Sequence, residues 1–146
     1  MLGRSGGRSG RVGRLLRPLG YLWASPWTLL ALSLAVLATG CGDSLSIRRG
    51  VIVCRGPWLT RLLRRVPIRG GAAAMTLGHV VLARDEASLV RCFDHELVHV
   101  RQYERWGPLF VPAYFVASAA AFLAGRDPYR DNRFEREAYG STGRSP

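Results

Sequence analysis

The stretch CFDHELVHVRQ, residues 92–102, decides how the rest of this chain is interpreted. It contains His95 and His99, which are four positions apart, and Glu96 directly after the first of them. In a helix, residues four positions apart lie one turn from each other on the same face. The stretch therefore either binds a metal ion through both histidines or is an amphipathic helix with two unrelated surface histidines.

The surrounding sequence predicts a helix over residues 86–106. Asp85 or Ser88 can cap its start, and the Gly-Pro pair at 107–108 ends it. At 100° per residue, the apolar side chains of residues 89, 93, 97 and 100 share one face, and charged side chains occupy another. The two histidines lie on a third face, and Glu96 lies at the border between that face and the apolar one.

The two histidines avoid both the apolar face and the charged face, and their spacing would suit a metal ion, although the motif alone does not decide between a metal site and an ordinary helix. Two imidazoles one turn apart can both bind Zn²⁺ at about 2.0–2.1 Å without bending the helix. A glutamate beside them can take a proton from a water molecule that the metal has made acidic. We therefore predict Zn²⁺ as the cofactor, His95 and His99 as ligands, and Glu96 as the general base.

A third ligand is expected further along the chain, in YRDNRFEREAYG at residues 129–140. This stretch has strong helix formers, and Asn132 can cap the helix. Either Glu135 or Glu137 would complete a set of two histidines and one glutamate, which leaves the fourth metal position open for water.

HELVH followed by FEREAY resembles the gluzincin metallopeptidases, in which a glutamate on a second helix completes the site of the first. The resemblance implies a small zincin-like α+β domain that hydrolyses peptide bonds in a peptide or protein substrate. It also implies that Glu135, and not Glu137, is the third ligand. Tyr139 departs from the pattern, because the family usually has at this position an aspartate that orients the first histidine.

A longer part of the sequence is also similar to short, uncharacterised bacterial membrane proteins. It consists of TLGHVVLARD before the motif and of HELVHVRQYERWGPLFVPAY. In zincins the preceding strand lines the cleft, so the resemblance implies that residues 75–82 pair with extended substrate. His79 on this strand is expected to be an ordinary strand histidine, and Cys92 a small buried side chain. Gln102 either forms a hydrogen bond across the site or faces water, and both alternatives remain open.

The N-terminal half has a different composition. The net charge of +11 lies entirely in residues 1–70, because nine of the ten acidic residues come later and balance the arginines there. Residues 1–18 are rich in Gly, Ser and Arg, which predicts a disordered basic tail. The tail lacks the interleaved aromatic residues of single-strand binders, so we expect no nucleic-acid partner.

Residues 19–39 are uncharged and long enough to cross a bilayer as a helix, so we expect a transmembrane anchor and membrane lipid as a partner. The arginines before this segment place the N-terminus in the cytoplasm and the zinc domain outside. Two alternatives are a cleaved signal peptide, for which AVLATGC offers a cleavage site, and lipid modification of Cys41.

A second apolar segment, residues 108–124, separates the histidines from Glu135. If this segment crossed a membrane once, the ligands would lie on opposite sides. We therefore expect it to return to the same side, as a core helix or as a segment that dips into the membrane.

The remaining elements complete the predicted domain over residues 44–140, which leaves 141–146 as a tail. We expect a strand at 47–54, a short helix at 58–66 and a β-rich run at 75–83. Two other functions stay open, namely a zinc-binding membrane protein without catalysis and a small membrane protein with a fortuitous motif. The substrate specificity and the oligomeric state do not follow from the sequence.

Overall fold

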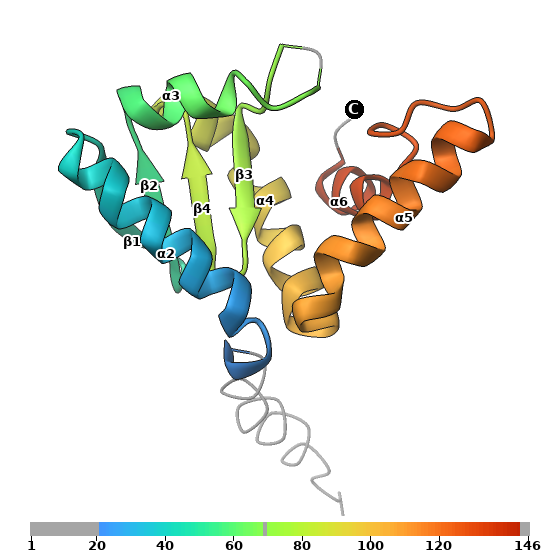
Figure 1. The fold of residues 1–146 in the computed structure, drawn as a ribbon, viewed down its shortest axis with the longest axis horizontal. Coiled ribbons are helices and arrows are strands. Elements are labelled where there is room, and N and C mark those ends of the chain that lie inside the picture. The colour runs from blue at the N-terminus through green and yellow to red at the C-terminus, as the bar shows by residue number, and fades with distance from the viewer. Residues whose placement is uncertain (1–20, 69, 144–146) are drawn as a thin grey trace, which may run out of the picture.

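The computed structural model describes residues 21–68 and 70–143. In this part, the chain forms a four-stranded sheet and five α-helices, which confirms the predicted α+β class (Figure 1). The strands are β1 (Ser44–Arg48), β2 (Val51–Arg55), β3 (Ala74–Leu77) and β4 (Val80–Ala83). The helices are α2 (Ser25–Gly40), α3 (Pro57–Leu63), α4 (Glu86–Trp106), the short 3₁₀ helix η1 (Gly107–Leu109), α5 (Phe110–Leu123) and α6 (Arg133–Thr142). The predicted tail at 1–18 and residues 144–146 lie outside the described part.

Both β-rich stretches fold as hairpins, so the prediction of single strands was wrong. Residues 47–54 are divided between β1 and β2, which a two-residue turn at Arg49–Gly50 connects. The run 75–83 divides into β3 and β4 at Gly78–His79. Gly78 has a φ of +60°, which the tight turns of hairpins favour at their first position. Each turn has only two residues and lies directly beside strand residues, so the sequence shows no clear break between the paired strands.

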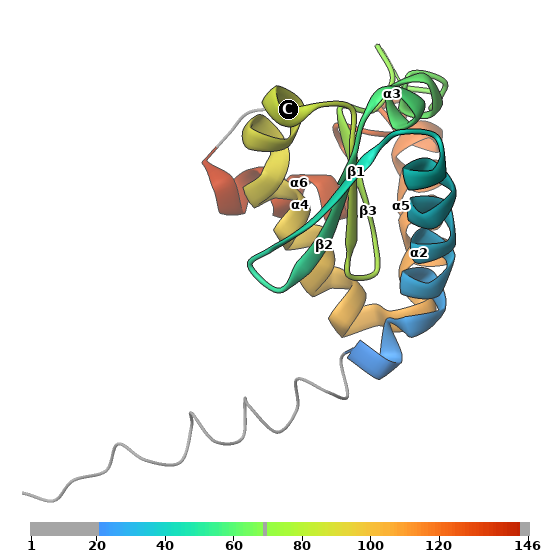
Figure 2. The ribbon, with the colours of Figure 1, turned by 90° about the vertical axis from the view of Figure 1, so that its left-hand side faces the viewer.

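The strands lie in the order β1-β2-β4-β3, so β3 is an edge strand. The central strands β2 and β4 are parallel, and each is antiparallel to its hairpin partner. Alternate side chains of β2 and β4 point to opposite faces of the sheet. One set packs against α4 (Val51, Val53, Val81 and Ala83). The other set packs against α2 (Cys54, Val80 and Leu82). The sheet is therefore covered by a helix on each face (Figure 2).

The helix α2 is part of this domain, although its sequence suggests a membrane anchor. The face that lies on the sheet carries three fully buried alanines: Ala31, Ala35 and Ala38. Large apolar side chains on its other face are exposed: Leu29, Leu30, Val36 and Leu37. The helix has 16 residues and a length of about 24 Å, less than the roughly 30 Å hydrocarbon core of a bilayer.

The helix α4 has the predicted bounds and the predicted faces. Asp85 caps it by accepting a hydrogen bond from the backbone N–H of Ser88 at 2.7 Å. Leu89 and Val100 are buried against the sheet, and Phe93 and Leu97 pack beside them. The apolar stripe thus anchors α4 and leaves the face of the histidines free to meet other elements.

After α4 the chain turns sharply, which brings its last helices back to the site. Gly107 has a φ of +55°, and a side chain there would collide with the ring of Trp23. Trp27 Nε1 donates a hydrogen bond of 3.1 Å to the backbone carbonyl of Pro108, which ties α2 to the turn. The helix α5 leaves from this point, and α6 returns to lie against α4 (Figure 1).

One helical run in the described part, Glu86–Leu123, is long and apolar enough to cross a membrane by length and composition. The run comprises α4, η1 and α5, and its uncharged portion begins after Arg105. The helix α5 has 14 residues, which gives it a length of about 21 Å. Most of its side chains are not buried, so α5 is no core helix behind α4.

Candidate metal centre

The helix α4 holds both predicted histidine ligands in the interior of the protein. His95 and His99 are 7% and 8% exposed, and their Nε2 atoms are 3.0 Å apart. The Nδ1 atom of His99 lies 2.8 Å from Gln102 Oε1, an atom that can only accept a hydrogen bond. In neutral His99 the proton is therefore on Nδ1, and the lone pair of Nε2 points into the site.

The helix α6 brings Glu135 to the two histidines. Asn132 caps this helix by accepting from the backbone N–H of Phe134 at 2.9 Å, as the sequence predicted. The buried ring of Phe134 fixes the helix in the core. Glu135 is 3% exposed, and its Oε2 and Oε1 lie 3.1 Å from His95 Nε2 and 3.4 Å from His99 Nε2.

These three side chains fit a metal ion. Tetrahedral ligands at 2.0–2.1 Å from zinc lie about 3.3 Å from one another. The two Nε2 atoms are 3.0 Å apart, and each lies 3.1–3.4 Å from a different oxygen of Glu135. One ligand atom from each residue lies within 4.8 Å of the other two. Glu135 Oε2 is buried and lies 3.1 Å from His95 Nε2, with no other partner among the described residues. A buried carboxylate that faces two imidazole nitrogens is an arrangement that suits a bound cation. The cluster of His95, His99 and Glu135 could therefore hold a metal ion.

The three groups strongly affect one another's protonation. Burial raises the pKa of Glu135, but hydrogen bonds from His95 and His99 outweigh it, and the pKa falls to about 2. Burial alone would lower the pKa of His99. Its hydrogen bond to Glu135 and the negative charge of Glu96 outweigh this effect and raise the pKa to about 9. Without a metal, the cluster therefore retains a proton at neutral pH, at the position where a cation would bind.

Gln102 connects the two ligand helices. Besides accepting from His99, it donates to the backbone carbonyl of Phe134 at 3.1 Å and to Glu137 Oε2 at 3.0 Å. Gln102 is fully buried, so the bond across the site is the alternative that the structure supports. Glu137 lies outside the cluster and is held by Gln102 and by Arg105, which donates to it at 3.1 Å.

His95 lacks the partner that His99 has. Its Nδ1 atom is buried and forms no hydrogen bond with the described residues. The ring of Tyr139 packs against the imidazole, with the two centroids 4.4 Å apart. On the Nδ1 side, His95 thus has ring packing in place of a hydrogen-bond acceptor, whereas its Nε2 contacts Glu135 and His99.

Glu96 is buried beside the cluster and faces the edge of the sheet. Its Oε2 accepts a hydrogen bond of 2.7 Å from the hydroxyl of Thr76 on β3. Burial raises the pKa of Glu96, although His99 and His95 are near enough to lower it in part. With Oε2 bound to Thr76, Oε1 is the atom available to take a proton. Thr76 belongs to the predicted β-rich run, but its position within that run gave no signal of this contact.

Tyrosines surround the carboxylate, which the sequence did not predict. Tyr114 donates a hydrogen bond of 2.7 Å to Glu135 Oε1. The hydroxyl of Tyr129 lies 3.5 Å from that of Tyr139. Tyr114 lies within the apolar segment 108–124, so the sequence gives no signal that its hydroxyl reaches Glu135.

The other predicted residues lie away from the cluster. His79 Nε2 is 3.1 Å from Glu104 Oε1, and its ring stacks on Tyr21 with the centroids 3.9 Å apart. His79 is therefore hydrogen-bonded away from the cluster, as predicted, although it lies in the turn between β3 and β4 and not on a strand. Cys92 is half-buried and is not one of the three clustered ligands.

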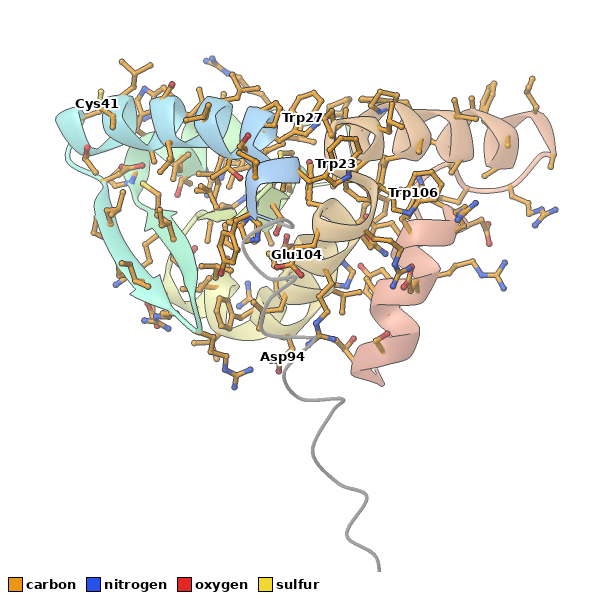
Figure 3. The ribbon with its side chains drawn as sticks, turned by 90° about the horizontal axis from the view of Figure 1, so that it is seen from below. Trp23, Trp27, Cys41, Asp94, Glu104 and Trp106 are labelled. Carbon is orange, nitrogen blue, oxygen red and sulfur yellow. The ribbon has the colours of Figure 1, made fainter. Side chains whose placement is uncertain are left out.

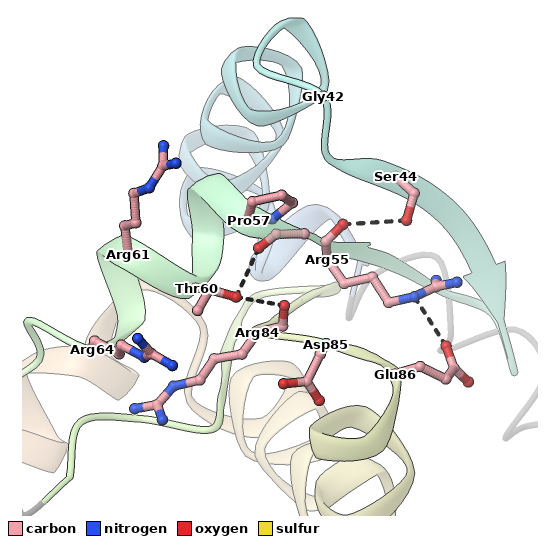
Figure 4. Close-up of a pocket in the computed structure, with 11 residues that line it drawn as sticks. Gly42, Ser44, Arg55, Pro57, Thr60, Arg61, Arg64, Arg84, Asp85 and Glu86 are labelled. Atoms are coloured by element: carbon pink, nitrogen blue, oxygen red, sulfur yellow. Dashed lines mark hydrogen bonds and ion pairs between the residues drawn. The ribbon is translucent and has the colours of Figure 1, made fainter.

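A separate pocket of about 630 Å³ lies between the start of α4 and α3 (Figure 4). Its charged lining residues are Arg55, Arg61, Arg64, Arg84, Asp85 and Glu86. Arg55 pairs with Glu86 at 3.0 Å, so part of the positive charge is already neutralised. None of the predicted ligands lines this pocket, so it is separate from the metal centre.

The chain matches no family model, no curated protein and no solved structure. The geometry of the cluster is therefore the basis on which a function is assigned.

Proposed function

We propose that this chain is a membrane-associated, zinc-dependent metallopeptidase of zincin-like fold. His95, His99 and Glu135 would be the zinc ligands, and Glu96 the general base. The observation that carries the proposal is the convergence of two ring nitrogens and one carboxylate, from helices far apart in the sequence, at distances of 3.0–3.4 Å. Nitrogen and carboxylate ligands in this number are typical of catalytic zinc sites.

Zinc bound here would supply a Lewis acid that makes a water molecule acidic and polarises the carbonyl of a peptide bond. The chain's own residues supply the proton transfers. Glu96 Oε1 would accept a proton from the attacking water and pass it to the leaving amine. Burial raises the pKa of Glu96, which brings a carboxylate closer to the range useful for both steps. The hydrogen bond from Thr76 holds the carboxylate in place.

The edge strand β3 is where we propose that a peptide substrate binds. It is antiparallel to β4 on one side and ends the sheet on the other. The side chain of Thr76 on this strand reaches the proposed base. An extended peptide paired along β3 would therefore lie next to Glu96, as β-strand addition requires.

Binding of zinc without catalysis is a second candidate, and Tyr139 favours it. The tyrosine ring lies on His95, and the three ligands are almost completely buried. A catalytic zinc keeps one position open to water and substrate, whereas a structural zinc is enclosed by protein.

Two measurements on the purified full chain test the proposal. Elemental analysis should find about one zinc ion per chain, because one cluster of three ligands is present in the described part. Turnover of a mixed peptide library should then disappear in Glu96→Gln while the zinc remains, because only the proton acceptor is lost. A chain that takes up neither zinc nor cobalt at neutral pH would exclude both candidates. A zinc-loaded wild-type chain with no turnover would leave the non-catalytic one.

A further inference from the structure

The helices α2 and α5 expose their large apolar side chains on the same side of the molecule. Figure 3 shows both helices along one edge, with Trp23 and Trp27 near their meeting point and Asp94 on the far side. The exposed residues on α2 and just before it are Tyr21, Leu22, Trp23, Leu29, Leu30, Val36 and Leu37. Those on α5 and the turn before it are Leu109, Phe115, Val116, Phe122 and Leu123. We name these twelve residues the apolar platform.

The polar groups of the platform helices are satisfied within the protein. No charged residue occurs in residues 19–42 or 106–125. On the exposed face of α2, the hydroxyl of Ser33 donates to the carbonyl of Leu29 at 3.0 Å, and that of Thr39 donates to Val36 at 2.8 Å. Hydroxyls that bond back to their own helix need no partner from water, as in helices that face lipid.

We propose that the apolar platform binds the surface of an anionic phospholipid bilayer and lies in a single leaflet. This binding mode differs from the crossing anchor that residues 19–39 suggest in the sequence. It stands on the exposed surface of two helices and is independent of zinc binding and catalysis.

A crossing position for α2 conflicts with its packing. Its alanine face is buried against Cys54, Val80 and Leu82 of the sheet. A helix that crossed the bilayer in this position would carry the sheet into the hydrocarbon, together with the edge strand β1 and the polar groups of Arg48. Open sheet edges do not occur in the hydrocarbon region, because their backbone groups would remain unsatisfied. A helix that lies in the interface avoids this cost.

Lipid fits the platform better than a second copy of the chain. Protein interfaces have a polar rim, but the uncharged segments continue to the ends of both helices. Trp23 is half-exposed just before the start of α2, and tryptophan favours the headgroup region. The net charge of +11 in residues 1–70 complements anionic headgroups.

The platform is fixed in shape by the turn between its helices. Trp27 on α2 donates to Pro108, and Gly107 admits the ring of Trp23. The two helices therefore present one surface of defined shape to the bilayer. Loss of either helix face should weaken binding, because the two contribute to the same contact.

Flotation of the full chain with vesicles tests this proposal. We expect the wild type to float with phosphatidylcholine vesicles, and more strongly with vesicles containing phosphatidylglycerol at low salt. The double variants Leu29→Asp/Val36→Asp on α2 and Phe115→Asp/Phe122→Asp on α5 should each reduce the partition coefficient about tenfold or more. The matched controls are Val90→Asp on α4 and Ile47→Asp on β1, which replace equally exposed apolar residues outside the platform and should float like the wild type.

Circular dichroism and thermal melting of each variant, in detergent, show that a loss of flotation is not a loss of folding. Sedimentation in detergent reveals the alternative occupant. The proposal is overturned if wild-type dimers become monomers in the platform variants while flotation is unchanged. It is also overturned if the control variants lose flotation as much as the platform variants do.

Topology reporters fused to the N-terminus and, separately, after Pro146 distinguish the platform from a crossing anchor. A platform in one leaflet leaves both reporters on the same side of the membrane. Signals from opposite sides would overturn the proposal. Neither result depends on zinc content, so failure of the platform and failure of the metal site can be told apart.

Discussion

Gln102 on α4 donates a hydrogen bond of 3.1 Å to the backbone carbonyl of Phe134, the residue before Glu135 on α6. The same side chain accepts from His99 through its oxygen at 2.8 Å. One buried amide therefore orients a histidine ligand and positions the helix that carries the carboxylate ligand. We therefore expect metal binding at this cluster to depend on Gln102 as well as on the three candidate ligands.

Gln102→Ala should lower zinc affinity by about 10- to 100-fold, because His99 loses its orienting acceptor. The free energy of unfolding should fall by about 2 kcal/mol, since the carbonyl of Phe134 loses its buried partner. Competition with a chelator and denaturant unfolding measure the two effects. Arg101→Ala, an exposed neighbour on α4, is the control. Equal affinities in wild type and Gln102→Ala would show that packing alone orients His99.

Glu135→Ala should abolish tight zinc binding, with a loss of about 100-fold or more, because it removes one of three ligands. Glu137→Ala should reduce the affinity by no more than about tenfold, since Glu137 only supports Gln102. Zinc content after dialysis separates the two variants. The reverse order would mean that the ligand on α6 has been assigned two residues too early.

Zinc binding at pH 7.5 should release close to one proton, because the pKa of His99 in the metal-free protein is about 9. The affinity should rise with pH and level off near that value. Since the folded pKa of His99 lies above its ordinary value, its contribution to the stability of the metal-free protein is complete below about pH 6.5. That contribution is lost as the pH rises through about 9. Calorimetry in two buffers of different ionisation enthalpy counts the protons, and a count of zero would contradict the expectation.

Tyr139→Asp should tighten zinc binding, by about tenfold, because a carboxylate can accept from the unpartnered Nδ1 of His95. Tyr139→Phe is the matched control, because it keeps the ring on His95 and should leave the affinity unchanged. Weaker binding in Tyr139→Asp would show that the packed ring does more for His95 than a hydrogen-bond acceptor would.

Ala35→Leu should lower the free energy of unfolding by about 1–3 kcal/mol, because Ala35 is fully buried between α2 and the sheet. Val36→Ala, on the exposed face of the same helix, should have little effect. Denaturant unfolding in mild detergent provides both values. A separate anchor helix would tolerate both substitutions equally, so equal stabilities would contradict the packing of α2.

The sequence predicted those elements in which apolar and charged residues follow a clear pattern. The cap at Asp85 and the Gly-Pro pair at 107–108 indicated the bounds of α4, and the periodicity of apolar and charged residues indicated its faces. The spacing of His95 and His99 indicated that they share one face. Glu135 required a resemblance, because a ligand on another helix leaves no local pattern. In α2 every position is apolar or small, so the buried alanines could not be distinguished from the exposed leucines. The contacts of Tyr114 and Gln102 depend on the turn at Gly107, which brings distant residues together without a sequence signal.

The alanine face of α2 also bears on how the chain could be processed after synthesis. Cleavage by a signal peptidase within AVLATGC would release the helix that covers Cys54, Val80 and Leu82. The remaining chain would have one face of its sheet bare and would lack the tryptophan that ties the turn before α5. In this fold, the segment that resembles an export signal supplies the helix that covers one face of the sheet, so we expect its removal to destabilise the folded domain.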